Sequence, residues 1–270
     1  MKSILLTITL ILLIALGGAN GQDKGEMLIP LSNPGTKGDL RVSVKRGSIT
    51  VTGANRQDVL IKYQALESKH GDNNTDRTKD GLQRISSGSI DLEVGENGNK
   101  VSVISDSWNK GIALIIEVPK TFDLNLDTYN GGFIKVDNIM GEVILENYNG
   151  EITAKGISGS VSANTYNGEI IIELLKVSPD VPMSFSTYNG DVDITLPSSS
   201  KADFKLKTNQ GEIYSGFSMD LIKSEPVKRT DSKSGTYKVY IDDWVRGKIN
   251  GGGSEIVMKN YNGDIYIRKQ

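Results

Sequence analysis

The stretch GEVILENYNGEITAKGISGSVSANTYNGEI, residues 141–170, contains one pattern twice and decides the fold. Its two Tyr-Asn-Gly steps end at Gly150 and Gly168, and related steps end at Gly131, Gly190, Gly211 and Gly263. Along the chain these glycines are separated by 19, 18, 22, 21 and 52 residues. A repeat of about 20 residues is typical of a solenoid, in which each copy forms one coil of a stack.

Residues on both sides of each glycine alternate between apolar and polar, which is the period of a β-strand with one buried face. After the glycine the apolar positions include Ile170 and Ile172, and the additional Gly132 of the first copy shifts Ile134 into this register, as a bulge would. The residues seven and five positions before the glycines are all apolar: Leu124, Leu126, Val143, Leu145, Val161, Ala163, Met183, Phe185, Phe204, Leu206, Ile256 and Met258. We therefore expect two short strands per coil, with these side chains inside.

The Asn-Gly step predicts a sharp corner between the two strands, because both residues adopt positive φ more readily than others. A second corner is expected about halfway round the coil, at Gly141 and Gly159. An antiparallel meander is the alternative, since Asn-Gly also forms hairpin loops. Equivalent residues at equivalent positions favour stacking at about 4.8 Å. The predicted fold is thus an all-β solenoid, like a parallel β-helix, with 18–22 residues per coil. Its corner residues are Asn130, Gly131, Asn149, Gly150, Asn167, Gly168, Asn189, Gly190, Gly211, Asn262 and Gly263.

The start of the chain, residues 1–21, has the features of a secretory signal peptide: a lysine, an apolar run and small residues at its end. The apolar run is shorter than the roughly 20 residues that span a membrane, so no stable span is expected after cleavage. Residues 22–38 are predicted to be an extension, and residues 39–270 a single solenoid domain. Within it we expect less regular coils at 39–118 with an exposed loop at 64–81, regular repeats at 119–215, an insertion at 218–235 and a closing coil at 236–270. The irregular first strands and the final YIRKQ are expected to cap the stack.

Composition excludes several classes of site. The chain has no cysteine and one histidine, His70, which falls in the polar loop, so His/Cys metal sites and cysteine nucleophiles are excluded. A formal net charge of −2 without basic blocks gives no indication of nucleic-acid binding. No catalytic residue, metal ligand or cofactor is assigned.

Stacking would align one outward tyrosine from each of five copies, with Asn209 in that place in another copy. Two interpretations stay open: a strip on which sugar rings or peptide bind, or stacked rings that shield the corner and stabilise it by about 0.5–1.5 kcal/mol per pair. Trp108 and Trp244 are expected to pack an end or an insertion. The candidate ligand-binding residues are Tyr129, Tyr148, Tyr166, Tyr188 and Tyr261.

Two further rows follow from the same alignment. The corner asparagines, with Gln210, are expected to form a ladder of hydrogen-bonded amides. An acidic row lies just past the corner, and either a cation or screening by solvent would relieve its repulsion. Its members are Glu151, Glu169, Asp191, Glu212 and Asp264.

The runs EVPKTFDLNLDTYNGGFIKV, FSTYNGDVDITLP and GGGSEIVMKNYNGDIYIRK, together with the opening stretch, resemble the bacterial putative-adhesin β-strand-repeat family, whose domains have no assigned function. The resemblance covers roughly residues 39–270, and it departs from the commoner Val-Ser-Gly corner by using tyrosine and asparagine. It implies an exported β-solenoid in the periplasm, on the cell surface or secreted, and it brings no catalytic residues.

We predict a non-enzymatic, adhesin-like protein that provides a binding or structural surface in the bacterial cell envelope, with a glycan or an envelope protein as partner. Two alternatives stay open. One is a polysaccharide-active enzyme on a β-helix scaffold. The other is a partner protein in envelope signalling.

Overall fold

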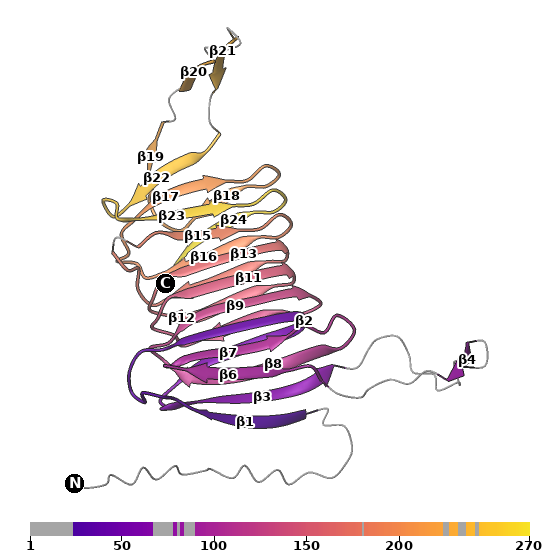
Figure 1. Ribbon diagram of the computed structural model, residues 1–270. Helices are drawn as coiled ribbons and strands as arrows, with labels where there is room; N and C mark the ends of the chain where they lie inside the picture. The colour runs from indigo at the N-terminus through magenta and orange to yellow at the C-terminus, as the bar shows by residue number, and fades with distance from the viewer. Residues whose placement is uncertain are drawn as a thin grey trace.

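The computed structural model describes residues 24–66, 90–179, 181–223 and 243–270, together with strands at 78–79, 82–83, 227–231 and 236–240. The predicted signal peptide, His70 and parts of the predicted loop and insertion lie outside these residues. Every regular element in the described ranges is a β-strand, and Figure 1 shows most of them as a single stack. The predicted all-β solenoid is confirmed.

Each coil contributes one strand to each of two sheets, and the Tyr-Asn-Gly corner joins the two strands. The strand β2 (Asp39–Ala54) is long enough to pass through this corner, so it belongs to both sheets. In spatial order, the first sheet contains β6 (Glu93–Asn97), β7 (Lys100–Ser105), the first part of β2, β9 (Asp123–Asn130), β11 (Val143–Asn149), β13 (Val161–Asn167), β15 (Met183–Ser186), β23 (Ser254–Lys259), β17 (Ala202–Lys207), β22 (Val245–Ile249) and β19 (Asp220–Ile222).

The second sheet holds the strands that follow the corner. In spatial order it contains β1 (Lys24–Pro30), β3 (Asp58–Leu66), β8 (Gly111–Pro119), the second part of β2, β10 (Ile134–Asp137), β12 (Ile152–Ile157), β14 (Ile170–Leu174), β16 (Val192–Leu196), β24 (Ile265–Lys269) and β18 (Ile213–Ser215). Two small hairpins lie outside the sheets: β4 (Thr78–Lys79) with β5 (Leu82–Gln83), and β20 (Val227–Asp231) with β21 (Thr236–Tyr240).

The core lies between the two sheets. Pairing in the regular coils is parallel and in register, with Val143 opposite Leu124 on one side and Val161 on the other, so inward positions lie on top of one another. All twelve apolar positions predicted before the corner are at most 2% exposed. Ile134 pairs with Ile152, as the predicted bulge requires. Each coil buries about four apolar side chains, and each contributes roughly 1.5–3 kcal/mol before the entropy of ordering is subtracted.

The order of coils in space differs from their order in the chain. The coil formed by β23 and β24 lies between the coils of β15–β16 and β17–β18, although it comes last in the sequence. In the same way, β2 lies between β7 and β9. The prediction that the final YIRKQ caps the stack is therefore wrong, because β24 has a partner strand on each side.

Antiparallel strands close much of the stack instead. β22 pairs antiparallel with β17 and β19 at one end, while β6 and β3 pair antiparallel with β7 and β8 at the other. The sheet also begins before the predicted residue 39, since β1 pairs with β3. Because β3 continues to Leu66, the first residues of the predicted loop belong to a strand. Antiparallel partners cover edges that would otherwise offer unpaired backbone groups to other chains.

Candidate functional site

Most of the predicted corner glycines are required because successive coils approach closely there; in the first copy Gly132, and not Gly131, makes this approach. A Cβ atom on Gly168 would collide with the carbonyl oxygen of Gly150, and one on Gly190 with that of Gly168. Both glycines also have positive φ, 158° and 142°. The corner asparagines do not: among the described residues, positive φ outside glycine is confined to Asn99, Asn138 and Asn250. The expectation that the asparagines serve the corner through their backbone is wrong, and their side chains explain them instead.

Those side chains form the predicted amide ladder in the middle of the stack. The Nδ2 of Asn167 donates to Oδ1 of Asn149 at 2.7 Å, that of Asn189 to Asn167 at 2.6 Å, and that of Asn262 to Asn189 at 2.6 Å. Hydrogen-bonded amides of this kind stabilise stacked strands. Asn130 and Gln210 align with the ladder through the backbone, but no side-chain hydrogen bond joins them to it. The ladder thus links four consecutive coils.

A second polar row, which the sequence analysis missed, lies inside the corner. In each of six coils, the residue three positions before the glycine of the repeated corner step points inward. Its side chain donates a hydrogen bond to the corner carbonyl of the adjacent coil. Thr165 Oγ1 donates to the carbonyl oxygen of Gly150 at 3.0 Å, and Thr187 Oγ1 to that of Gly168 at 2.9 Å. Thr128, Asn147, Thr208 and Asn260 make the equivalent bonds. These bonds give the half-buried or buried corner carbonyls a partner, and a carbonyl shielded from water without one is costly.

Outside the corner, the five predicted tyrosines form one continuous stack. Ring centroids are 4.7 Å apart for Tyr129 and Tyr148, 5.2 Å for the next pair, then 4.9 Å and 4.8 Å up to Tyr261, with planes within 7° of parallel. The side chains are 38–44% exposed. None of their hydroxyls makes a hydrogen bond to another described residue. The ring faces are therefore shared between neighbours, while the edges and hydroxyls face outward.

Trp108 extends this row at one end. It lies in the connection between β7 and β8, and its ring meets Tyr129 edge to face, with centroids 5.2 Å apart and planes at 76°. The indole is 54% exposed, more than any of the five tyrosines. At the other end the adjacent coil carries Asn209, whose neighbour Gln210 pairs with Asn262. We call Trp108, Tyr129, Tyr148, Tyr166, Tyr188 and Tyr261 the aromatic strip.

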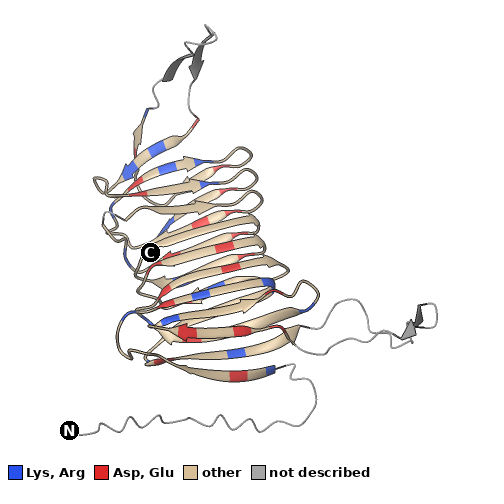
Figure 2. Cartoon of the chain, in the orientation of Figure 1, with Lys and Arg blue, Asp and Glu red and all other residues tan. Residues whose placement is uncertain are grey.

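Carboxylates lie beside the strip on both strands. Asp127 and Glu146 precede Tyr129 and Tyr148 by two positions on the same strand face, and the acidic row follows the corner. Figure 2 shows acidic residues over the middle strands and basic residues on β17 and β22 at one end. No group of three or more Asp, Glu or His side chains in the described residues is arranged to hold a metal ion.

Some members of the acidic row bond protein groups. Asp191 Oδ1 accepts the backbone N–H of Asp264, and Asp264 Oδ1 accepts that of Glu212, both at 2.8 Å. Asp264 also accepts the hydroxyl of Tyr266 at 2.9 Å, and this bond raises the pKa of that tyrosine to about 12. These carboxylates satisfy backbone donors of the next coil, so their repulsion is partly offset without a metal.

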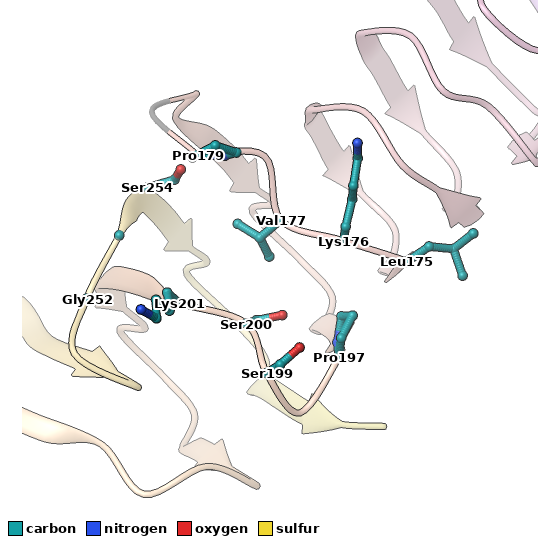
Figure 3. A pocket seen from close by; sticks show the side chains of 11 residues that line it. Leu175, Lys176, Val177, Pro179, Pro197, Ser199, Ser200, Lys201, Gly252 and Ser254 are labelled. Atoms are coloured by element: carbon teal, nitrogen blue, oxygen red, sulfur yellow. The ribbon is translucent and has the colours of Figure 1, made fainter.

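A cavity of about 340 Å³ lies at the opposite corner of the coils (Figure 3). Its lining includes Val177, Pro197, Lys201 and Ser200, whose buried hydroxyl oxygen has no hydrogen-bond partner. Glycoside hydrolysis uses a pair of carboxyl groups. The described residues that line this cavity include none.

The sequence of the chain matches one known family. The profile of the family described as Toastrack DUF4097 matches residues 9–250. The chain belongs to the Toastrack DUF4097 family. The predicted resemblance to an adhesin-type β-repeat family is confirmed with it, and the wide match indicates that the Toastrack fold extends through most of the chain.

One solved structure resembles this Toastrack chain in fold, and a second matches it with a low TM-score. A putative cell adhesion protein from Clostridium sporogenes ATCC 15579 is 13% identical, with a TM-score of 0.52, over 92% of this chain and 100% of its own. A putative adhesin from Bacteroides fragilis NCTC 9343 is 12% identical, with a TM-score of 0.33, over 93% of this chain and 98% of its own. No functionally curated protein matches the sequence. In the part of the chain that the structure describes, no helix is long and apolar enough to cross a membrane.

Proposed function

We propose that this Toastrack protein is exported and acts without catalysis in the bacterial cell envelope, as an adhesin-like protein whose binding surface is the aromatic strip. One observation carries the proposal: six aromatic side chains, each 38–54% exposed, form one continuous row on the surface. Tyrosine and tryptophan favour interfaces because they combine a large apolar surface with a polar group.

The fold supports such a surface by holding the strip rigidly. Each tyrosine follows an inward Thr or Asn that is bonded to the adjacent coil, and in four coils it precedes an asparagine of the amide ladder. The backbone at the strip is therefore fixed on both sides of every ring between Tyr148 and Tyr261. A ligand that contacts several rings would lose little free energy to ordering of the protein.

Because the strip repeats one aromatic side chain per coil, a single long ligand can contact several rings at once. Each ring offers a weak contact, but consecutive contacts on one ligand add, because the later ones form within a complex that already exists. The name of the similar protein from Clostridium, which refers to cell adhesion, agrees with this role. At 13% identity that structure supports the fold rather than the function.

The test is a binding assay on a glycan array and on isolated cell-wall material, using residues 22–270. A variant with Tyr148, Tyr166 and Tyr188 changed to serine should lose binding while circular dichroism shows the same fold. The matched control is Tyr214→Ser, because Tyr214 is 51% exposed but lies outside the strip. Equal binding by the triple variant and the wild type would overturn the proposal, as would absence of binding by both.

A further inference from the structure

The geometry of the strip restricts how a ligand can contact it. Tyr148, Tyr166 and Tyr188 each have a parallel ring at both faces, so a sugar ring cannot stack on them. At one end, Trp108 meets Tyr129, and at the other end the coil next to Tyr261 has Asn209 in place of a tyrosine. Along the row, a ligand meets ring edges and hydroxyls. The indole of Trp108, which is perpendicular to the tyrosines, is the most exposed ring of the strip.

The five hydroxyls form a regular array of hydrogen-bonding groups. They lie at the outer ends of rings spaced 4.7–5.2 Å apart, and none has a partner among the described residues. Each hydroxyl is a donor and an acceptor. A ligand gains most from such an array when its own polar groups repeat at the same spacing along a line.

This spacing discriminates between kinds of linear polymer. An extended peptide advances by about 3.3 Å per residue, so its polar groups fall out of step with the tyrosines after one or two contacts. In an extended β-1,4-linked glycan, each pyranose ring and its linkage span about one coil of the stack, and every sugar carries hydroxyls. A glycan chain lying along the stack axis therefore stays in step with successive tyrosines.

Charge beside the strip selects among glycans. Carboxylates flank the rings from Tyr129 to Tyr188: Asp127, Glu146, Glu151, Glu169 and Asp191. Basic side chains lie near the two ends, where Lys45 and Arg46 are level with Tyr129 and Asn130, and Lys259 precedes Tyr261 by two positions. Lys45 pairs with Asp106 at 3.8 Å. A polymer of acidic sugars would be repelled over most of the strip, whereas a neutral one meets carboxylate oxygens that accept hydrogen bonds.

We propose that the aromatic strip binds a neutral β-1,4-linked glycan along the stack axis, with the tyrosine hydroxyls bonding successive sugars and Trp108 contacting one sugar ring at the end. The inference rests on the proposed function, because it assigns a ligand to the same surface. Binding energy should then grow with the number of sugars until the row is filled.

The experiment is a titration of residues 22–270 with cello-oligosaccharides and N-acetylglucosamine oligomers of two to six sugars, followed by tryptophan fluorescence and calorimetry. We expect the affinity for at least one series to rise roughly two- to tenfold per added sugar, as one hydrogen bond each would give. Tyr148, Tyr166 and Tyr188 changed together to phenylalanine should lower the affinity for the six-sugar ligand by about tenfold or more. Tyr214→Phe is the control, and polygalacturonate should not bind.

The outcomes separate this inference from the proposed function. If the phenylalanine variant binds with full affinity and the serine variant does not bind, the hydroxyls have no role, and the strip is still a binding surface. If affinity does not change beyond two sugars, or if only acidic glycans or cell-wall proteins bind, the neutral glycan is not the ligand. The proposed function then stands and this inference is overturned. A dimer that the serine variant disrupts would assign the strip to a second copy, whose rings have the same spacing. Absence of binding to every array glycan, oligomer and cell-wall sample overturns both proposals.

Discussion

The side-chain amide of Asn262 donates to that of Asn189 at 2.6 Å although 73 residues separate them in the chain. The bond exists because the last coil of the sequence lies inside the stack. The ladder of amides therefore joins two coils that are adjacent in space but far apart in the sequence.

Removing this coil should be far more damaging than removing a terminal strand. Deletion of residues 254–270 leaves the two adjacent coils without a partner on one side. It also removes four buried apolar side chains, Ile256, Met258, Ile265 and Ile267. At roughly 1.5–3 kcal/mol each, their loss is comparable to the stability of a whole domain. We expect no cooperative thermal unfolding. Deletion of residues 22–30 removes only the outer strand β1 and should lower the melting temperature moderately. Similar melting of both variants would contradict the inserted coil.

Two corner glycines offer a matched pair of substitutions. Gly168→Ala should cost roughly 4 kcal/mol or more, because the new methyl group meets the carbonyl of Gly150 and the coils must separate. Gly131 has φ of 77° but nothing within 4 Å of its Cβ position, so Gly131→Ala should cost only about 1–2 kcal/mol of backbone strain. Chemical denaturation measures both. Equal costs would mean that φ, and not the approach of coils, requires glycine at the corner.

The tyrosine stack should stabilise the fold whatever it binds. Tyr166 contacts a parallel ring on each face, so Tyr166→Ser should lower the free energy of unfolding by roughly 1–3 kcal/mol. Tyr166→Phe keeps both contacts and should stay within about 0.5 kcal/mol of the wild type. If the serine variant is as stable as the phenylalanine variant, stacking contributes nothing, and the strip is kept for binding alone.

A pH-dependent contact ties the β1–β2 connection to the turn after β6. Glu96 accepts the backbone N–H of Ser32 at 3.0 Å and that of Asn99 at 2.9 Å, and these bonds lower the pKa of its carboxyl group. The unfolded value is about 4.3. The stabilisation is therefore present above that pH, and it is lost as pH falls through the lower folded value. An NMR titration should show the lowered pKa, and Glu96→Gln should weaken the dependence of stability on acid pH. A titration of Glu96 at its ordinary value would refute the contact.

The alternation of apolar residues predicted the strands, the two sheets and the buried face of every regular coil, because all copies have the same alternation and align in one register. Because the copies are so similar, the alternation does not predict the order of the coils in space. Ile256 and Met258 match Met183 and Phe185 as well as they match Phe204 and Leu206, so the pattern alone cannot assign the neighbours of the last coil. The neighbours of the last coil are determined by the lengths of the connections and by the antiparallel strands at the ends of the stack. Neither feature is part of the repeated pattern, so the repeat does not predict them.

The site was predicted in part for the same reason. The five tyrosines recur at one position and could be aligned, whereas Trp108 belongs to a connection and has no counterpart in other copies. The inner row was visible as threonine or asparagine before each tyrosine, but its acceptors are backbone carbonyls of neighbouring coils. Every residue has a backbone carbonyl, so the residue types do not show which carbonyls accept these bonds.

The inserted coil also determines how the molecule responds to mechanical force. β24 is bonded to β16 on one side and to β18 on the other, so tension applied along it loads two ladders at once, in shear. β1 has one neighbour, β3, and can peel away bond by bond. A pull applied through β24 would therefore be spread over the middle of the stack, whereas a pull applied through β1 would act on its outermost strand alone.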